Sequence, residues 1–366
     1  MKHQSSLFSQ ILSLIPRKKF DILVSRHKAE RHAKGFSCWT QFVAMLFCQL
    51  AQAKSLREIC SGLRICLGKL NHLGLKSAPK RSTLSYANAH RPWRLFRNVY
   101  FELLELCRSA FPGKPKRFRF RNKLLSFDAT LIELCASIFD WAKFRKTKGA
   151  VKLHTLLDHD GYLPTYVYIS EGKKHEVNVA RTLKIPPGSV IVVDRGCVDY
   201  ELFYYWTKQG VWFVTRLKAN AKYRVIKRLP VPTGGNVLRD EVIEFTGYNS
   251  RRKCPVMLRR VVVRDEENER EVVLLSNNFK FSARTIGEIY RERWQIEIFF
   301  KELKQHLKIK TFVGTSANAI HIQIWTALIA MLLLKYLKYL SKYNWSLSNL
   351  IALIRWNLFT YRDLWS

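Results

Sequence analysis

Apolar and polar positions divide the chain into stretches of different periodicity, of which the first is helical. Phe36–Ala53 is rich in apolar residues, lacks proline and glycine, and is long enough for a helix. Ser55 and Glu58 have the spacing of a capping box, so a further helix is predicted to begin at Ser55. Several short helices with basic turns are typical of a helix-turn-helix-like module. We therefore predict an all-α domain over residues 1–110.

The pattern changes after residues 111–121, FPGKPKRFRFR, which predict a basic linker because they combine two prolines, a glycine and five basic side chains. Lys123–Cys135 alternates as a strand does, and the turn Asp158–Gly161 predicts a hairpin. Ser189–Asp194 is a β-branched run that suits a central strand. Strand, hairpin, helix, strand, helix and strand over residues 122–218 predict an α/β fold of ribonuclease-H-like order.

The remaining sequence first becomes all-β and then returns to helix. Four candidate strands separated by turn residues predict a β-rich insertion over residues 219–283. Helical periodicity over residues 284–366 predicts that the α/β core is completed by a helix at Tyr290–Leu307 and by C-terminal helices. Ile320–Tyr339 is predicted to be a core helix.

The net charge of the sequence indicates which class of molecule the protein binds. The 366 residues contain 63 Lys and Arg against 28 Asp and Glu, a net charge of +35. Residues 1–120 carry 23 basic against 5 acidic side chains, a net of +18. Such an excess argues against an ordinary small-molecule enzyme and for nucleic acid. The longest apolar run, Ile322–Leu334, is shorter than the ~20 residues that span a bilayer, so no membrane association is expected.

Eight cysteines are scattered along the sequence, and none forms a CxxC pair. A zinc ribbon or finger is therefore not expected. Most of the cysteines lie beside apolar residues, as small core residues do in a reducing compartment. The sequence predicts a cytoplasmic protein without disulfides.

Two acids follow apolar strand segments. Asp128 lies within the run Leu124–Thr130, where an isolated carboxylate is costly unless it is paired. Asp194 ends Ser189–Asp194 and is followed by Arg195 and Gly196, as in acids that face a crevice at a sheet edge. Either acid alone is equally compatible with a structural turn cap.

A third acid lies on the predicted helix Tyr290–Leu307. At ~100° per residue, Tyr290, Arg293, Glu297 and Lys304 fall within an arc of about 60°, next to the apolar face. This is the arrangement of a helix that lines a site. The alternative is a solvated face with ion pairs between residues four apart.

Three carboxylates from two strands and a helix suit one kind of chemistry. Attack on a phosphodiester requires charge neutralisation at phosphorus, which two divalent ions ~3.5–4 Å apart supply. Mg²⁺ prefers carboxylate oxygens and retains waters. Basic side chains on the same helix would then bind the flanking phosphates.

The spacing Y-x2-R-x3-E-x6-K from Tyr290 to Lys304 resembles the signature of insertion-sequence transposases of the IS-four family, which are DDE transposases. Asp194-Arg195-Gly196 and the N-terminal words Ser55–Ile59 and Arg81–Leu84 are also similar to this family. The resemblance implies a ribonuclease-H-like core with Asp128, Asp194 and Glu297 as ligands of two Mg²⁺ ions, for which Mn²⁺ can substitute. It also implies a β-rich insertion between Asp194 and Glu297.

The leading hypothesis is a transposase in the bacterial cytoplasm, associated with the nucleoid. It would bind the terminal inverted repeats of its element as a homodimer in a synaptic complex, cleave the DNA ends and join them to target DNA. We expect Tyr290, Arg293, Lys304, Arg195 and Arg216 to contact phosphates. Lys218 is a further candidate for this role. His175 and Glu176 are candidates for a place near the metals, although capping of a loop is the favoured interpretation of both.

Two other hypotheses stay open. One is a catalytically silent, sequence-specific DNA-binding protein of the same fold, and the other is a ribonuclease-H-like nuclease such as a junction resolvase. The relatives that use a hairpin intermediate stack a flipped base on a tryptophan in the insertion. This chain has no tryptophan between Trp212 and Trp294, so the sequence leaves the hairpin route open.

Overall fold

The computed structural model describes residues 5–31, 33–66, 68–110, 118–135, 143–145, 148–231 and 233–364. These residues form two compact units, which are described separately. The first unit comprises residues 1–113, 132–150 and 300–366, and the second comprises residues 114–131 and 151–299.

Helices of the first unit begin at capping residues that are visible in the sequence. The Ser55 hydroxyl accepts a hydrogen bond from the Glu58 N–H at 3.1 Å, so α4 (Leu56–Ile65) begins where the capping box predicts. Ser37 caps α3 (Cys38–Leu50) in the same way. The other helices near the chain ends are α1 (Leu7–Ser13), α2 (Arg17–Arg26), α5 (Arg81–His90), α6 (Arg94–Ala110) and α13 (Leu347–Asn357).

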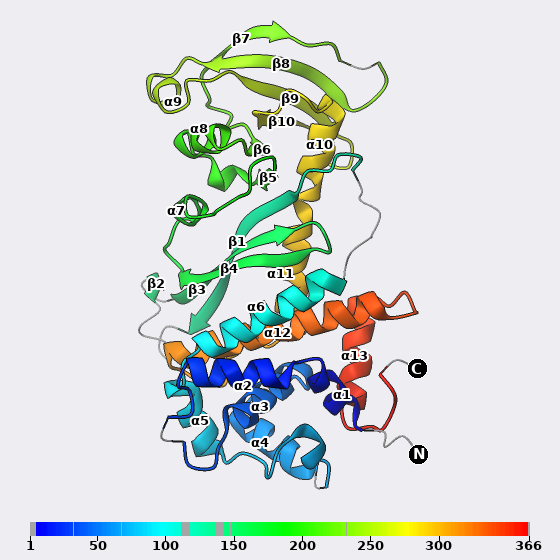
Figure 1. Ribbon diagram of the computed structural model, residues 1–366. Coiled ribbons are helices and arrows are strands. Elements are labelled where there is room, and N and C mark those ends of the chain that lie inside the picture. The colour runs from blue at the N-terminus through cyan, green and yellow to red at the C-terminus, as the bar shows by residue number, and fades with distance from the viewer. Residues whose placement is uncertain are drawn as a thin grey trace. The chain divides into compact units, whose positions relative to one another are not determined.

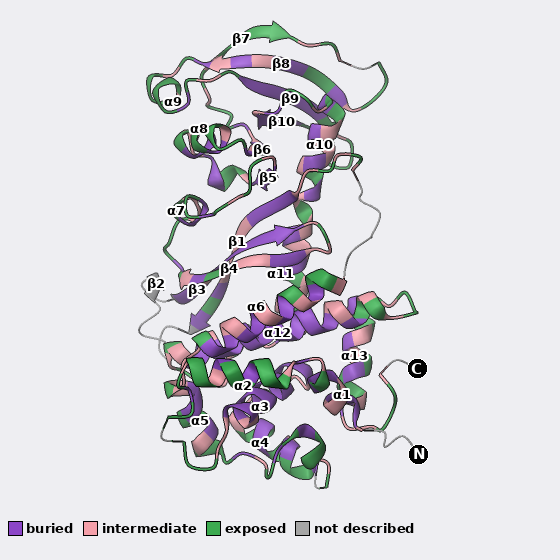
Figure 2. Ribbon diagram, in the orientation of Figure 1, coloured by how far each residue is buried: buried purple, intermediate pink, exposed green. Residues whose placement is uncertain are grey.

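The centre of the first unit is α12 (Ala317–Leu340), which packs against α3, α5, α6 and α13 (Figure 1). Most of its residues are buried, as Figure 2 shows in purple. At 24 residues it extends beyond the predicted core helix and is long and apolar enough to cross a membrane, although 83% of its most apolar window is buried in the protein. Apolar character on every side is what a helix surrounded by other helices requires.

The core of the first unit therefore combines both ends of the chain. Residues 1–110 supply helices that pack on α12, more than 200 residues further along the sequence. A fragment of residues 1–110 lacks this central helix, so experiments on the N-terminal helices require the full chain.

A mixed sheet lies mainly in the second unit, and only its residues within 132–150 belong to the first unit. Among the described residues the strands are β1 (Leu124–Cys135), β2 (Lys143–Arg145), β3 (Lys148–Asp158), β4 (Leu163–Glu171), β5 (Val190–Val193), β6 (Trp212–Arg216), β7 (Tyr223–Arg228), β8 (Val237–Phe245), β9 (Leu258–Asp265) and β10 (Arg270–Ser276). Their order is β2-β3-β1-β5-β6-β10-β9-β8-β7, with β4 paired to β3. The strands β1, β5 and β6 run parallel, and the other pairs are antiparallel.

Helices cover both faces of this sheet. On one face α7 (Glu176–Ala180) and α8 (Tyr200–Lys208) pack on Leu125, Phe127 and Ile191. On the other face α10 (Ala283–Glu292) packs on Leu124, Val190 and Val192. Alternate residues of each strand thus face different helices, as the period of two requires.

The strands predicted as a β-rich insertion extend the same sheet. β10 pairs with β6 in antiparallel fashion, and β9, β8 and β7 follow in order (Figure 1). This pairing covers the edge of β6, which would otherwise be open. The four strands predicted within residues 219–283 are confirmed as β7, β8, β9 and β10. The short helix α9 (Tyr248–Lys253) was not predicted.

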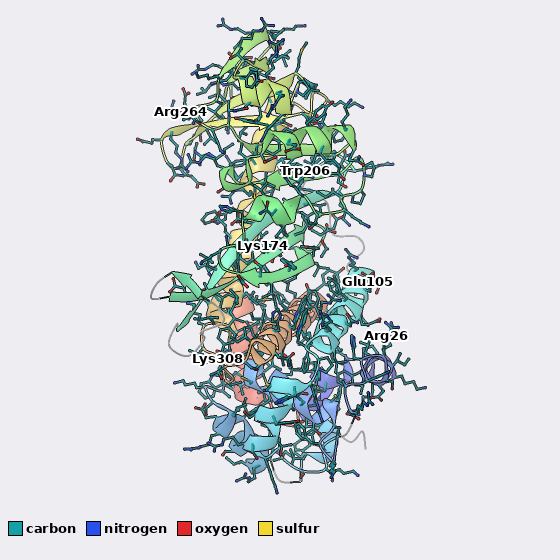
Figure 3. All side chains as sticks on the ribbon, turned by 90° about the vertical axis from the view of Figure 1, so that its left-hand side faces the viewer. Arg26, Glu105, Lys174, Trp206, Arg264 and Lys308 are labelled. Atoms are coloured by element: carbon teal, nitrogen blue, oxygen red, sulfur yellow. The ribbon has the colours of Figure 1, made fainter. Side chains whose placement is uncertain are left out.

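Basic side chains are exposed and cysteines are buried, as the sequence predicts. Basic side chains such as Arg26 and Arg264 are exposed (Figure 3). The seven cysteines whose side chains the structure describes are buried free thiols.

Candidate active site

Strand register brings the first two acids together. β1 and β5 are parallel, and their last paired residues are Phe127 and Val193. Asp128 and Asp194 each come directly after these residues, at the same level of the sheet. Asp194 follows the carboxyl end of β5, and Arg195–Cys197 then form a single 3-10 turn. A strand end of this kind is where parallel sheets place functional side chains.

The third acid lies beyond a helix break. The sequence predicts one helix over Tyr290–Leu307, and this prediction is wrong at Arg293, where α10 ends and α11 (Trp294–His306) begins. The Arg293 N–H bonds the Tyr290 carbonyl at 3.1 Å, a span of three residues instead of four. A helical wheel assumes constant rotation, so it does not reveal a tightened turn.

Arg293 connects two of the acids. Its guanidinium lies 2.6 Å from the Glu297 carboxylate and 3.8 Å from that of Asp128. The Arg293 side chain is 15% exposed, Asp128 18% and Glu297 32%. The Tyr290 hydroxyl donates a hydrogen bond to Asp194 at 3.5 Å. The alternative interpretation, a solvated face with ion pairs, is therefore correct only in part. The pair Arg293–Glu297 forms, but it is largely shielded from water.

The electrostatics of Asp128 reflect its crowded position. Burial is the main cause that raises its pKa, to about 7, and the neighbouring carboxylates of Glu176 and Asp194 add to the increase. The Ala129 N–H donates to Asp128 at 2.8 Å and, with Arg293, lowers the pKa in part. A cation beside Asp128 would therefore favour its ionised form, as the nearby guanidinium of Arg293 does.

The donor set fits a hard divalent ion, since carboxylate oxygens are the ligands that Mg²⁺ prefers. Among the residues that the structure describes, no three His, Cys, Asp or Glu side chains are arranged to enclose a metal ion. The positive charge beside Asp128 and Glu297 is instead that of Arg293. That Asp128, Asp194 and Glu297 hold the ion stays a prediction.

A fourth carboxylate borders the acids. Glu176 begins α7, accepts a hydrogen bond from the Cys197 thiol at 3.5 Å, and lies 3.7 Å from the Lys152 ammonium. Burial, followed by the charges of Glu176 and Asp128, raises the pKa of Cys197, so this thiol is not a nucleophile at neutral pH. The sequence indicated Glu176 but not Lys152, whose place on β3 has no local signal.

Basic residues line a groove next to Asp194. The groove is formed by Asp194, Arg195, Gly196, Lys218, Ala219 and Asn220. Arg195 and Lys218 are exposed. Arg216 is close enough for its charge to act on the Tyr290 hydroxyl, whose pKa is raised mainly by burial. The predicted basic residues Arg195 and Arg216 thus lie near the acids.

Lys304 belongs to the first unit, where Lys310 and Glu133 are its charged neighbours. Burial is the main cause that lowers the pKa of its ammonium. Its role at the site stays a prediction.

Residues 119–333 match the family model of the transposase DDE domain, and residues 3–76 match DUF4372, a domain of unknown function. The chain belongs to the DDE transposases. The family predicted from Tyr290, Arg293, Glu297 and Lys304 is confirmed, and with it the expectation of a DNA-acting enzyme of the insertion-sequence type.

Curated relatives carry the same description as transposases. The chain is 30% identical to y4zB of Sinorhizobium fredii (strain NBRC 101917 / NGR234) over 290 residues, which is 78% of this chain and 80% of the relative. It is 29% identical to the transposase for insertion sequence element IS5377 of Geobacillus stearothermophilus, over 70% of this chain and 67% of the relative. A third, for IS4SA of Synechocystis sp. (strain ATCC 27184 / PCC 6803 / Kazusa), is 27% identical over 70% and 71%.

A cryo-EM structure of the piggyBac transposase synaptic complex with hairpin DNA superposes on this DDE transposase with a TM-score of 0.44 and 9% identity. The match covers 96% of this chain and 78% of that one. Similarity at this level is too low to assign a fold.

Proposed function

We propose that the chain binds the terminal inverted repeats of its insertion sequence, cleaves the DNA at those ends and joins them to target DNA. The core of the second unit would be ribonuclease-H-like, with the strand block of residues 219–283 as its elaboration. Residues 1–110 would recognise the ends, residues 111–121 would serve as a basic linker, residues 122–218 and 284–366 would supply the catalytic core, and two copies would act in the synaptic complex.

One observation carries this proposal. The parallel register of β1 and β5 aligns Asp128 with Asp194, and Arg293 links Asp128 to Glu297, so three acids from separate parts of the sequence share one neighbourhood. When bound by these carboxylates, two Mg²⁺ ions would activate the attacking oxygen and stabilise the leaving oxygen, and Mn²⁺ could replace them.

The side chains around the acids would orient the DNA. Arg195 and Lys218 border the groove beside Asp194 and suit phosphate oxygens. The Tyr290 hydroxyl contacts the same acid, and Arg216 is close enough for its charge to act on Tyr290. Arg293 is engaged with Asp128 and Glu297, so it would neutralise the acids before DNA arrives and turn to a phosphate when metal replaces it. Lys304 would hold a further phosphate.

The experiment is strand transfer of pre-cut terminal repeats in Mg²⁺ by the full chain and by Asp128→Asn, Asp194→Asn and Glu297→Gln. Each substitution should abolish joining while DNA binding persists, because binding comes mainly from phosphate contacts. Glu288→Gln on α10, whose carboxylate pairs with exposed Arg284, is the matched control and should stay active.

The outcomes separate the competing functions. Specific end binding without joining by the unaltered chain would indicate a silent DNA-binding protein. Cleavage of branched DNA without end joining would indicate a resolvase. Full activity of any one acid variant would remove that residue from the site.

A further inference from the structure

A group of buried polar side chains in mutual contact lies beside the acids of the second unit. The Ser126 hydroxyl and the Nε2 atom of His159 share a hydrogen bond of 2.7 Å. The Nδ1 atom of the same imidazole lies 3.6 Å from the Glu292 carboxylate, a polar contact that is longer than a hydrogen bond. The Tyr162 hydroxyl donates to that carboxylate at 3.3 Å. Ser126 is 0% exposed and Glu292 2%.

Serine, histidine and an acid in this order have the chemistry of a nucleophilic triad, but here burial excludes that role. A nucleophilic hydroxyl must reach a substrate carbon or phosphorus, and the Ser126 hydroxyl is sealed within the protein. The group instead connects three parts of the fold. Ser126 lies on β1, His159 and Tyr162 belong to the β3–β4 hairpin turn, and Glu292 ends α10.

The first and last members of this polar group, Ser126 and Glu292, are close in sequence to residues of the candidate active site. Ser126 precedes Asp128 by two positions on β1 and therefore faces the same side of the strand. Glu292 directly precedes Arg293, the residue at the break between α10 and α11. The His159 N–H also donates to the Leu124 carbonyl at 3.1 Å, which ties the hairpin turn to β1 a second time.

Such a group restricts geometry more than an apolar contact does. Buried polar atoms lose stability when a partner moves away, so their distances are held within narrow limits. Leucine side chains at these positions would fill the space and still allow the helix junction to slide along β1. Polar partners at defined distances do not allow it.

We propose that Ser126, His159 and Glu292 are positioning residues that set the distance between Asp128 on β1 and the junction that carries Arg293 and Glu297. The catalytic consequence rests on the proposed function, whereas the geometric consequence does not. Each of the three residues would act through the residues that it positions, because Ser126 and Glu292 are buried.

The test compares Ser126→Ala with Ser170→Ala in the full chain. Ser170 also bonds a buried imidazole, that of His154, at 2.9 Å, but it lies on β4, which pairs with β3 and not with β1. Each variant therefore removes a hydrogen bond between a serine and an imidazole from the same sheet, although Ser170 is less buried than Ser126. Hydrogen exchange of residues 289–297 should become about fivefold faster in Ser126→Ala and remain unchanged in Ser170→Ala.

The reaction supplies the second measurement. The rate of strand transfer at saturating DNA should fall about 10- to 100-fold in Ser126→Ala and Glu292→Gln, with the dissociation constant for DNA unchanged. Ser170→Ala should keep the full rate. His159→Gln, which retains a hydrogen-bonding side chain, should recover more activity than His159→Leu.

Failure of the proposed function and failure of this inference would give different results. If the unaltered chain joins no DNA, the proposed function is wrong, and hydrogen exchange alone decides whether the junction is held by these residues. If Ser126→Ala and Ser170→Ala have the same exchange at residues 289–297 and the same rate, the group is only part of the core and the inference is overturned.

Discussion

Replacing Arg293 with glutamine should destabilise the second unit, and Mg²⁺ should reverse the loss. At an effective dielectric constant of about 20, the attraction between unit charges is about 6 kcal/mol at 2.6 Å and about 4 kcal/mol at 3.8 Å, before desolvation is subtracted. Breaking buried pairs costs about 3–5 kcal/mol. Because these side chains are 15–32% exposed, we expect about 2–3 kcal/mol.

The assay is thermal unfolding with and without Mg²⁺. A loss of 2–3 kcal/mol corresponds to roughly 5–10 °C for a unit of this size. An ion that binds the acids stabilises the folded state by about 2.7 kcal/mol at 100 times its dissociation constant. Since Arg293→Gln leaves the acids without a guanidinium, its midpoint should rise more with Mg²⁺ than that of the unaltered chain.

Arg284→Gln is the matched control. Arg284 and Glu288 also form an Arg–Glu pair four residues apart, at 3.0 Å, but their side chains are 76% and 40% exposed. Exposed pairs of this kind contribute about 0–1 kcal/mol. Equal destabilisation by the two substitutions, or an equal response to Mg²⁺ in variant and unaltered chain, would refute the reasoning.

Three further predictions concern other residues. Arg259 forms a bidentate pair with Asp240 at 2.6 and 2.8 Å in a buried setting; Arg259→Met should cost about 3–5 kcal/mol in urea unfolding, and the addition of Asp240→Leu should recover most of it. Burial and nearby lysines lower the pKa of His154 to about 4, so the unfolded chain takes up a proton first as pH falls from 6.5. The free energy of unfolding should therefore decline by about 3 kcal/mol from pH 6.5 to pH 4. If His154→Gln loses as much stability over this range as the unaltered protein, the prediction is contradicted. Lys218→Ala should reduce the salt slope of DNA binding by about one unit, and an unchanged slope would remove Lys218 from the interface.

Much of the local structure and the family could be predicted from neighbouring residues alone. Capping at Ser55, the β-branched run before Asp194 and the hairpin turn at Asp158–Gly161 are encoded by neighbours in the chain, and all three are found in the structure. The spacing from Tyr290 to Lys304 identified the family because a motif is a property of sequence.

The side chains that meet at the candidate site could not be predicted in this way, because they come from segments far apart in the sequence. The alignment of Asp128 with Asp194 depends on the register of β1 and β5, which are more than 60 residues apart and pair through backbone atoms common to all residues. The break at Arg293 and the burial of Glu292 against His159 likewise follow from packing between distant segments. Periodicity reports which face of an element is apolar, but it carries no information on what that face meets. The union of both chain ends around α12 was therefore hidden in the sequence, although each helix was visible.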